Sequence, residues 1–149
     1  MQIQYRICLL VFAIALLSGC ATGPKYGEVK QSIPSLKQTE GRIFFYRSGN
    51  PFGSGIQPSV MLNGNKVGES TPGGFFFVDM NPGPMEIVLS TEVERKLTFT
   101  LSAGQVRYVR MSVGLGVIIY RVYPELVDES VGQSEIVDLS YTGDKLTAK

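Results

Sequence analysis

Short apolar runs separated by turn-forming residues fill the chain from residue 42 to residue 123. In one run Leu97, Phe99 and Leu101 alternate with polar residues, which is the period of a strand with one buried face. Glycines and prolines fall between the runs, and Asn63-Gly64 has the composition of a tight hairpin turn. The pattern predicts an all-β domain over residues 41–141, a single β-sandwich of about seven strands, with an open barrel as the alternative.

The end of this domain has a mixed pattern. Val127 and Val131 share one face of a helix, whereas Val137, Leu139 and Tyr141 alternate as in a strand. We expect a short C-terminal helix followed by irregular chain. Residues 142–149 are expected to form a loose tail.

Two aromatic triplets, at residues 44–46 and 75–77, lie in predicted strands. Successive side chains of a strand point to opposite faces, so each triplet places aromatic rings on both faces. Either the sheet is covered on both sides, by the second sheet and by the C-terminal segment, or an aromatic strip is exposed for binding. The second interpretation gives a candidate interaction surface that consists of Phe45, Tyr46, Phe76, Arg47 and Arg107.

The N-terminus carries an export signal. One basic residue, Arg6, precedes an apolar run over residues 7–17. The run suits the core of a signal peptide and is too short to span a bilayer, which needs roughly 20 apolar residues. We predict a signal peptide over residues 1–19; an uncleaved anchor with an incidental cysteine is the alternative.

The Leu-Ser-Gly-Cys sequence at residues 17–20 resembles the bacterial lipobox. The resemblance implies a diacylglycerol on the Cys20 sulfur, cleavage before Cys20 and acylation of the new amino end, with palmitate as an expected chain. Two or three acyl chains hold a protein stably on a membrane, at ~0.8 kcal/mol per buried CH₂. Ala21 stands where lipoproteins of the inner membrane have aspartate, so the resemblance implies an outer-membrane protein that faces the periplasm.

Residues 20–40 form the lipidated N-terminus and its linker. They contain glycine, proline, lysine and glutamine without a sustained apolar period, which is typical of a flexible tether. The alternative is that part of the segment packs on the domain through its few apolar residues, which are Tyr26, Val29, Ile33 and Leu36.

Composition narrows the chemistry. Loss of residues 1–19 removes Arg6 from the 14 basic residues and leaves 13 acidic residues unchanged, so the mature chain has no net charge. This balance argues against nucleic acid as a partner and against electrostatic adhesion to anionic lipids. Histidine, the commonest general base and metal ligand, is absent, and Cys20 is the only cysteine that remains. We therefore expect no cofactor, no metal and no disulfide.

The remaining charged residues offer two weaker signals. Carboxylates gather near the C-terminal end, and they would serve a hydrolase only if a cleft held two of them about 5 to 10 Å apart. A solvated helix face is the simpler interpretation of these residues, which are Glu125, Asp128, Glu129 and Glu135. Arginines recur along the strands, and we expect them to pair with acids or flank strands rather than form an anion site; they are Arg42, Arg47, Arg107, Arg110 and Arg121.

Three patterns carry a family resemblance: GRIFFYR at residues 41–47, Val-x-Leu-Asn-Gly-x-x-Val-Gly at residues 60–68, and Gly-x-x-Arg-Tyr-Val at residues 104–109. The second pattern, with Pro82-Gly83, is similar to PEGA-type modules, which are small β-sandwich repeats of bacterial envelope proteins. Together with the lipobox, the chain resembles lipoproteins of the domain of unknown function 2846 family over residues 41–139. The family has no assigned reaction, so the resemblance implies a fold and no catalytic residue.

These observations favour a non-catalytic envelope lipoprotein. Lipid on Cys20 would tether a β-sandwich that binds another envelope component, a protein or a glycan. A carrier or inhibitor with a small-ligand pocket between the sheets is the main alternative. A hydrolase that uses carboxylates is the third.

Overall fold

The computed structural model describes residues 20–91, 93–115 and 120–146. The predicted signal peptide at residues 1–19 lies outside this part of the chain. Within the described residues, no helix has the length and hydropathy that a membrane crossing requires.

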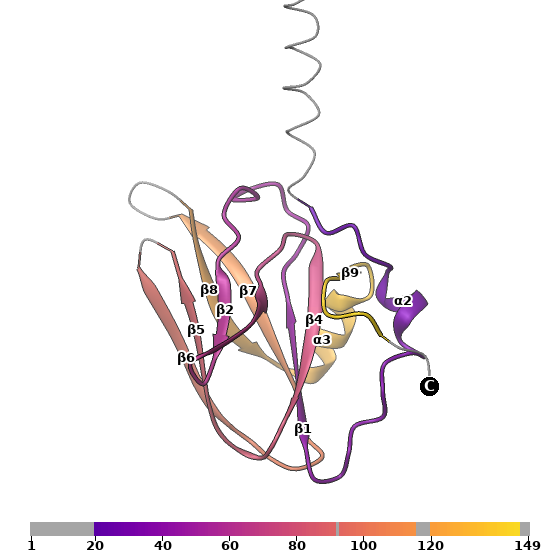
Figure 1. The fold of residues 1–149 in the computed structure, drawn as a ribbon. Helices are drawn as coiled ribbons and strands as arrows, with labels where there is room; N and C mark the ends of the chain where they lie inside the picture. The colour runs from indigo at the N-terminus through magenta and orange to yellow at the C-terminus, as the bar shows by residue number, and fades with distance from the viewer. Residues whose placement is uncertain (1–19, 92, 116–119, 147–149) are drawn as a thin grey trace, which may run out of the picture.

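Two β-sheets form a sandwich, which confirms the predicted fold class (Figure 1). The larger sheet has the strand order β8-β7-β1-β4-β9 and the smaller sheet the order β3-β2-β5-β6. Described residues supply nine strands, two more than the sequence pattern suggested. The larger sheet consists of β1 (Gly41–Tyr46), β4 (Gly74–Met80), β7 (Val106–Leu115), β8 (Tyr120–Val127) and β9 (Ser140–Tyr141). The smaller sheet consists of β2 (Ser59–Leu62), β3 (Asn65–Glu69), β5 (Gly83–Ser90) and β6 (Glu94–Leu101).

The turn between β2 and β3 has the predicted geometry. Asn63 has φ 48° and Gly64 has φ 80°, so both central residues have the positive φ that a tight hairpin turn requires. The Asn63 side chain also accepts a 2.8 Å hydrogen bond from the backbone N–H of Glu86 in β5. The turn therefore fixes the hairpin and joins it to the neighbouring strand.

The space between the sheets is filled by a hydrophobic core. Phe45 and Phe76 stack at 5.0 Å between ring centroids, and both belong to this inner core. The other buried members are Ile43, Val60, Leu62, Met85, Ile87, Leu89, Leu101, Val109, Met111 and Val122. Burial of this apolar surface is the main interaction that stabilises the sandwich.

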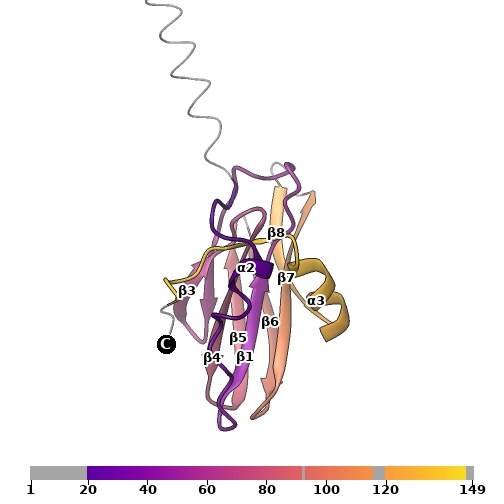
Figure 2. The same cartoon turned by 90° about the vertical axis from the view of Figure 1, so that its right-hand side faces the viewer.

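A second hydrophobic core covers the outer face of the larger sheet. Its buried members are Val29, Phe44, Tyr46, Phe75, Tyr108, Ile136 and Leu139. Helix α3 (Glu129–Ile136), the predicted C-terminal helix, closes this outer core (Figure 2). The helix approaches β7 closely because Gly132 has no side chain: a Cβ there would lie 2.2 Å from the Tyr108 ring.

These two cores correct the prediction of an exposed aromatic strip. Phe45, Tyr46 and Phe76 are buried, and Arg47 is fully buried beside them. The physical reason is that both faces of the larger sheet are covered, so strand β1 is buried at all six positions. The alternative interpretation, with the sheet covered on both sides, is confirmed.

The N-terminal segment also differs from the predicted flexible tether. Helix α2 (Tyr26–Val29) packs Val29 into the outer core. The Tyr26 N–H donates a 3.0 Å hydrogen bond to the Leu139 carbonyl, and the Tyr141 N–H donates a 2.8 Å bond to the Pro24 carbonyl. The segment packs despite its polar composition because its apolar residues and the outer face of the sheet bury apolar surface against each other. The alternative, packing on the domain, is what the structure has.

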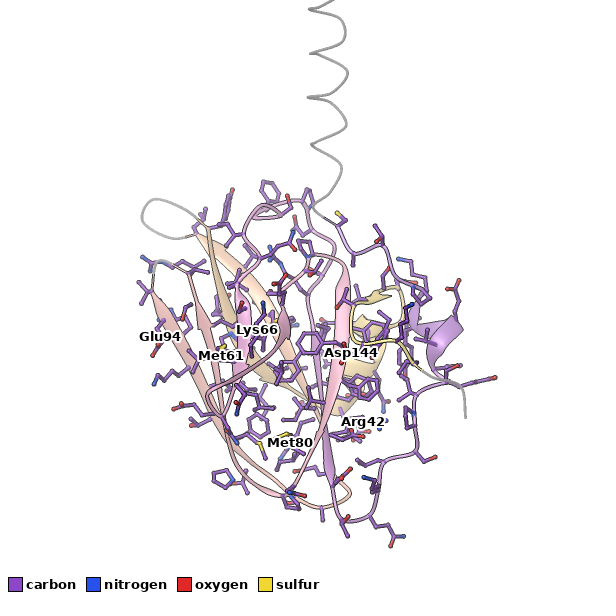
Figure 3. The ribbon with its side chains drawn as sticks, in the orientation of Figure 1. Arg42, Met61, Lys66, Met80, Glu94 and Asp144 are labelled. Atoms are coloured by element: carbon purple, nitrogen blue, oxygen red, sulfur yellow. The ribbon has the colours of Figure 1, made fainter. Side chains whose placement is uncertain are left out.

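Arg42 joins the same segment to the sheet (Figure 3). Its guanidinium donates to both carboxylate oxygens of Asp79, at 2.6 and 2.7 Å, and to the Pro34 carbonyl at 2.8 Å. The guanidinium carbon also lies 4.5 Å from the centroid of the Phe77 ring. Because the Arg42 side chain is almost fully buried, these partners compensate the cost of removing its charge from water.

The first residues of the C-terminal tail, which was predicted to be loose, are attached to the domain. The Thr142 N–H donates a 2.8 Å hydrogen bond to the Phe75 carbonyl, and Leu146 packs against the outer core. Only the last residues of the predicted tail, 147–149, lie outside the described part of the chain.

Candidate functional site

The polar side chains of the outer face converge on Arg110, which lies in β7. Arg110 Nη1 lies 2.9 Å from Glu135 Oε1 in α3, and Arg110 Nε lies 3.3 Å from Glu125 Oε2 in β8. The Tyr46 hydroxyl donates a 2.5 Å hydrogen bond to Glu135 Oε2, and the Ser112 hydroxyl donates to Glu125. We call these five residues the Arg110 cluster.

Strand register explains why these residues meet. Arg110 is directly opposite Glu125 in the antiparallel pair β7–β8 and opposite Tyr46 in the parallel pair β1–β7. Directly opposite side chains share one face of the sheet, here the outer face. Helix α3 crosses this face and adds Glu135.

A pocket of about 320 Å³ adjoins the cluster. It lies between the end of β1, the loop that follows and α3, and it is lined by Tyr46, Ser48, Gly49, Arg110, Glu135 and Leu139. Arg110 and Glu135 line the pocket and keep about a third of their side-chain surface exposed, so a ligand there would reach their charged atoms directly.

Burial and neighbouring charges shift the pKa values of two groups in the cluster. Burial, followed by the hydrogen bond to Glu135, raises the pKa of Tyr46 well above its ordinary value, so the phenol keeps its proton at neutral pH. Burial lowers the pKa of Arg110, but Glu135 and Glu125 outweigh this effect and the net shift is upward. One guanidinium faces two carboxylates, so the charged groups sum to one negative charge and suit a hydroxyl-rich or amine-bearing ligand.

Arg47 was predicted on an interaction surface, but in the structure it is a buried residue that binds backbone carbonyls. Its guanidinium is buried without an ion pair among the described residues, and burial lowers its pKa. It donates hydrogen bonds to the carbonyls of Ile56 at 2.6 Å, Gly53 at 2.7 Å and Ser70 at 2.9 Å. Arg47 therefore holds the loop between β1 and β2 against the next turn, and this loop supplies Ser48 and Gly49 to the pocket.

The structure brings only one of the predicted surface residues, Tyr46, into the site. Phe45 and Phe76 belong to the inner core. Arg107 is half-buried and lies opposite Ile43, so it shares the inner face of the sheet rather than the face of the cluster. The predicted arginines and carboxylates did include Arg110 and Glu135, but nothing in their sequence spacing pairs them.

The acidic side chains at the site are paired with a guanidinium rather than grouped with one another. Among the described residues, no group of three or more histidine, cysteine, aspartate or glutamate side chains is placed to hold a metal ion. Glu135, which lines the pocket, and Glu125 both form ion pairs with Arg110.

The fold and the site describe a small β-sandwich with a polar pocket on one covered face. A family model described as "Protein of unknown function (DUF2846)" matches residues 37–122, more than half of the chain. The chain belongs to this family, as its sequence patterns predicted. The match includes β1 to β7 and the first strand positions of β8, and therefore Arg110 but not α3.

A relative extends the similarity beyond the family model. An uncharacterized protein of Haemophilus influenzae is 24% identical over 144 residues, which cover 93% of this chain and 84% of the relative. No solved structure matches the chain. Neither comparison tests the resemblance to PEGA-type modules or to the lipobox, so both stay predictions.

The buried phenols predict a loss of stability in alkali. The pKa of Tyr108 is raised to about 12, mainly by burial, and that of Tyr46 is also raised, against 10.0 for an ordinary tyrosine. The unfolded chain therefore ionises first, so their contribution is complete below about pH 10 and falls as the pH rises further. Urea unfolding between pH 8 and pH 11 should show a shallower decline for Tyr46→Phe than for the wild type. Equal slopes would contradict the burial of this phenol in the folded state.

Proposed function

We propose that the chain is a lipid-anchored protein of the bacterial cell envelope whose β-sandwich is a non-catalytic binding module for an envelope protein or glycan. The observation that carries the proposal is the Arg110 cluster beside its pocket. Hydrogen-bond donors and acceptors converge there on a partly exposed surface, which is the arrangement of a recognition site.

The pairing within the cluster supports binding rather than hydrolysis. A carboxylate mechanism needs one carboxyl group that donates a proton and another that acts as a base or nucleophile. Here both Glu125 and Glu135 form ion pairs with Arg110, and each also accepts a hydrogen bond from a hydroxyl group. Both carboxylates are therefore already occupied by partners within the protein, so neither is free to contact a scissile bond.

The carrier alternative has less support. A small ligand between the sheets would need space where the twelve buried residues of the inner core now pack. The pocket at the Arg110 cluster lies instead on the outer face of the larger sheet, open to solvent. A surface pocket of this size suits a side chain or a sugar unit of a larger partner.

The lipid anchor rests on the lipobox resemblance and on the position of Cys20. Cys20 is an exposed, free cysteine at the start of the described chain. The relative in Haemophilus influenzae agrees with a bacterial origin. Ala21 after the cysteine supports the outer membrane as the site of attachment, with the domain in the periplasm.

Replacement of the lipid-bearing residue tests the anchor. Cys20→Ser should leave an unprocessed precursor or release the protein from membranes, because the thiol is the acceptor of the diacylglycerol. Membrane fractionation and intact-mass measurement of the mature protein would report both outcomes. An unmodified Cys20 in the mature wild-type protein would contradict the anchor.

Site-specific photo-crosslinking tests the binding role. A benzoylphenylalanine at Ser48, in the pocket lining, should capture an envelope component in living cells, whereas the same probe at Ser102 should not. Arg110→Gln should lower the Ser48 product by about tenfold or more, as expected for a central interface residue.

The matched control is Lys66→Gln, which removes an exposed ion pair with Glu69 on β3, in the smaller sheet (Figure 3). It should leave the Ser48 product unchanged. The same product from Ser48 and Ser102, or no effect of Arg110→Gln on a variant that remains folded, would refute a binding role for this pocket.

A further inference from the structure

One end of the sandwich gathers the start of the described chain and several loops (Figure 1). Strands β1 and β7 run parallel, so both finish at this end, where β4 begins. The Ala21 N–H donates a 2.9 Å hydrogen bond to the Pro72 carbonyl, which places Cys20 there too. We call it the Cys20 end; it consists of Cys20, residues 47–58, 70–73, 90–91 and 93–94, and the strand ends at Leu115 and Tyr120.

Large apolar side chains are exposed at the Cys20 end. Phe52 is 62% exposed, Val93 is 43% exposed and Leu115 is 85% exposed. They come from three loops or strand ends that are far apart in the sequence. The other exposed large apolar residues of the described chain lie in β8, in α3 and directly after α3, and none lies in the turns of the opposite end; they are Leu126, Val131 and Val137.

The loop that carries Phe52 is held in place. The buried guanidinium of Arg47 binds the carbonyls of Gly53 and Ile56, on the C-terminal side of Phe52. The Phe52 ring lies 6.2 Å from the Tyr120 ring, between centroids. An aromatic ring exposed to solvent contributes little to the stability of the monomer and is typical of an interaction surface. Because the loop is already fixed, it loses little conformational entropy when a partner buries the ring.

Two arginines share a pocket with Leu115. A pocket of about 400 Å³ is lined by Arg95, Arg121 and Leu115, together with Lys96, Gly114, Tyr123 and Pro124. Lys96 is paired with Glu94 and Glu86. Guanidinium groups bind phosphate oxygens through two parallel hydrogen bonds, so this pocket suits a lipid phosphate next to an inserted apolar side chain.

We propose that the Cys20 end docks on the surface of the membrane that carries the Cys20 lipid. Phe52, Val93 and Leu115 enter the boundary between headgroups and acyl chains, and Arg95 contacts lipid phosphates. The inference rests on the proposed lipid anchor. A lipid surface is the occupant of this end because the Ala21 N–H is bonded to the Pro72 carbonyl, so acyl chains on Cys20 would bring this end directly to the headgroups.

Depth-dependent quenching tests the docking on the full lipidated chain. Leu115→Cys and Ser102→Cys variants would be labelled with bimane and reconstituted in vesicles of phosphatidylethanolamine and phosphatidylglycerol that contain a shallow nitroxide lipid. Bimane at residue 115 should be quenched about threefold more than bimane at residue 102, which lies in the turn between β6 and β7 at the opposite end. Bimane at Phe52→Cys should behave like the label at residue 115.

Flotation of the vesicles separates the two proposals. A chain that fails to float with the vesicles overturns the lipid anchor and the docking with it. A chain that floats but shows equal quenching at residues 115 and 102 overturns the docking alone. Quenching at residue 115 that appears only after envelope proteins are added would assign this end to a protein partner and also overturn the proposal.

The contact of Arg95 with lipid phosphate has a test of its own. Arg95→Gln should lower the quenching at residue 115 by about twofold, because it removes a contact with lipid phosphate. Lys66→Gln, on β3, is the matched control and should have no effect. Equal quenching in the wild type and Arg95→Gln would refute the assigned role of this arginine.

Discussion

Strand β1 is buried along its whole length, and most of the fold follows from the need to cover both of its faces. Phe45 points into the inner core, whereas Phe44 and Tyr46 point into the outer core. The smaller sheet covers the inner face. The outer face is covered by two segments from opposite ends of the sequence, α2 with its neighbours and α3.

This double covering connects the chemistry to the fold. Tyr46 reaches Glu135 only because α3 lies over the outer face, and Glu135 in turn completes the partners of Arg110. Farther along the same outer face, Arg42 holds the N-terminal segment through the Pro34 carbonyl. The N-terminal segment is therefore part of the domain, and the position of Cys20 is set by packing rather than by the reach of a tether.

The sequence predicted the class of fold because strand periodicity and turn residues are local signals. Alternation at Leu97, Phe99 and Leu101 and the Asn63-Gly64 turn need no knowledge of distant contacts. The role of the aromatic triplets was harder to predict from the sequence. The same aromatic residues would occur in these strands whether the outer face is covered or exposed. Polar composition around Val29 likewise concealed a segment that packs, because burial depends on the partner surface.

The candidate site depends on contacts between residues far apart in the chain, which no local sequence pattern indicates. Arg110 meets Tyr46 through parallel pairing across about sixty residues of chain, and it meets Glu135 through the placement of a helix on a sheet. Tyr46 was predicted as a surface residue together with Phe45, yet alternation sends the two to opposite cores. Only one of them reaches the pocket.

Hydrogen exchange of the N-terminal segment tests the account most directly. The amide of Tyr26 is bonded to Leu139 and the amide of Tyr141 to Pro24, so both should exchange slowly in the lipidated protein, at rates near those of the β1 amides. Cys20 and its lipid would then be fixed beside the domain. Exchange of Tyr26 as fast as that of an exposed loop amide such as Asn50 would show a free tether and contradict the account.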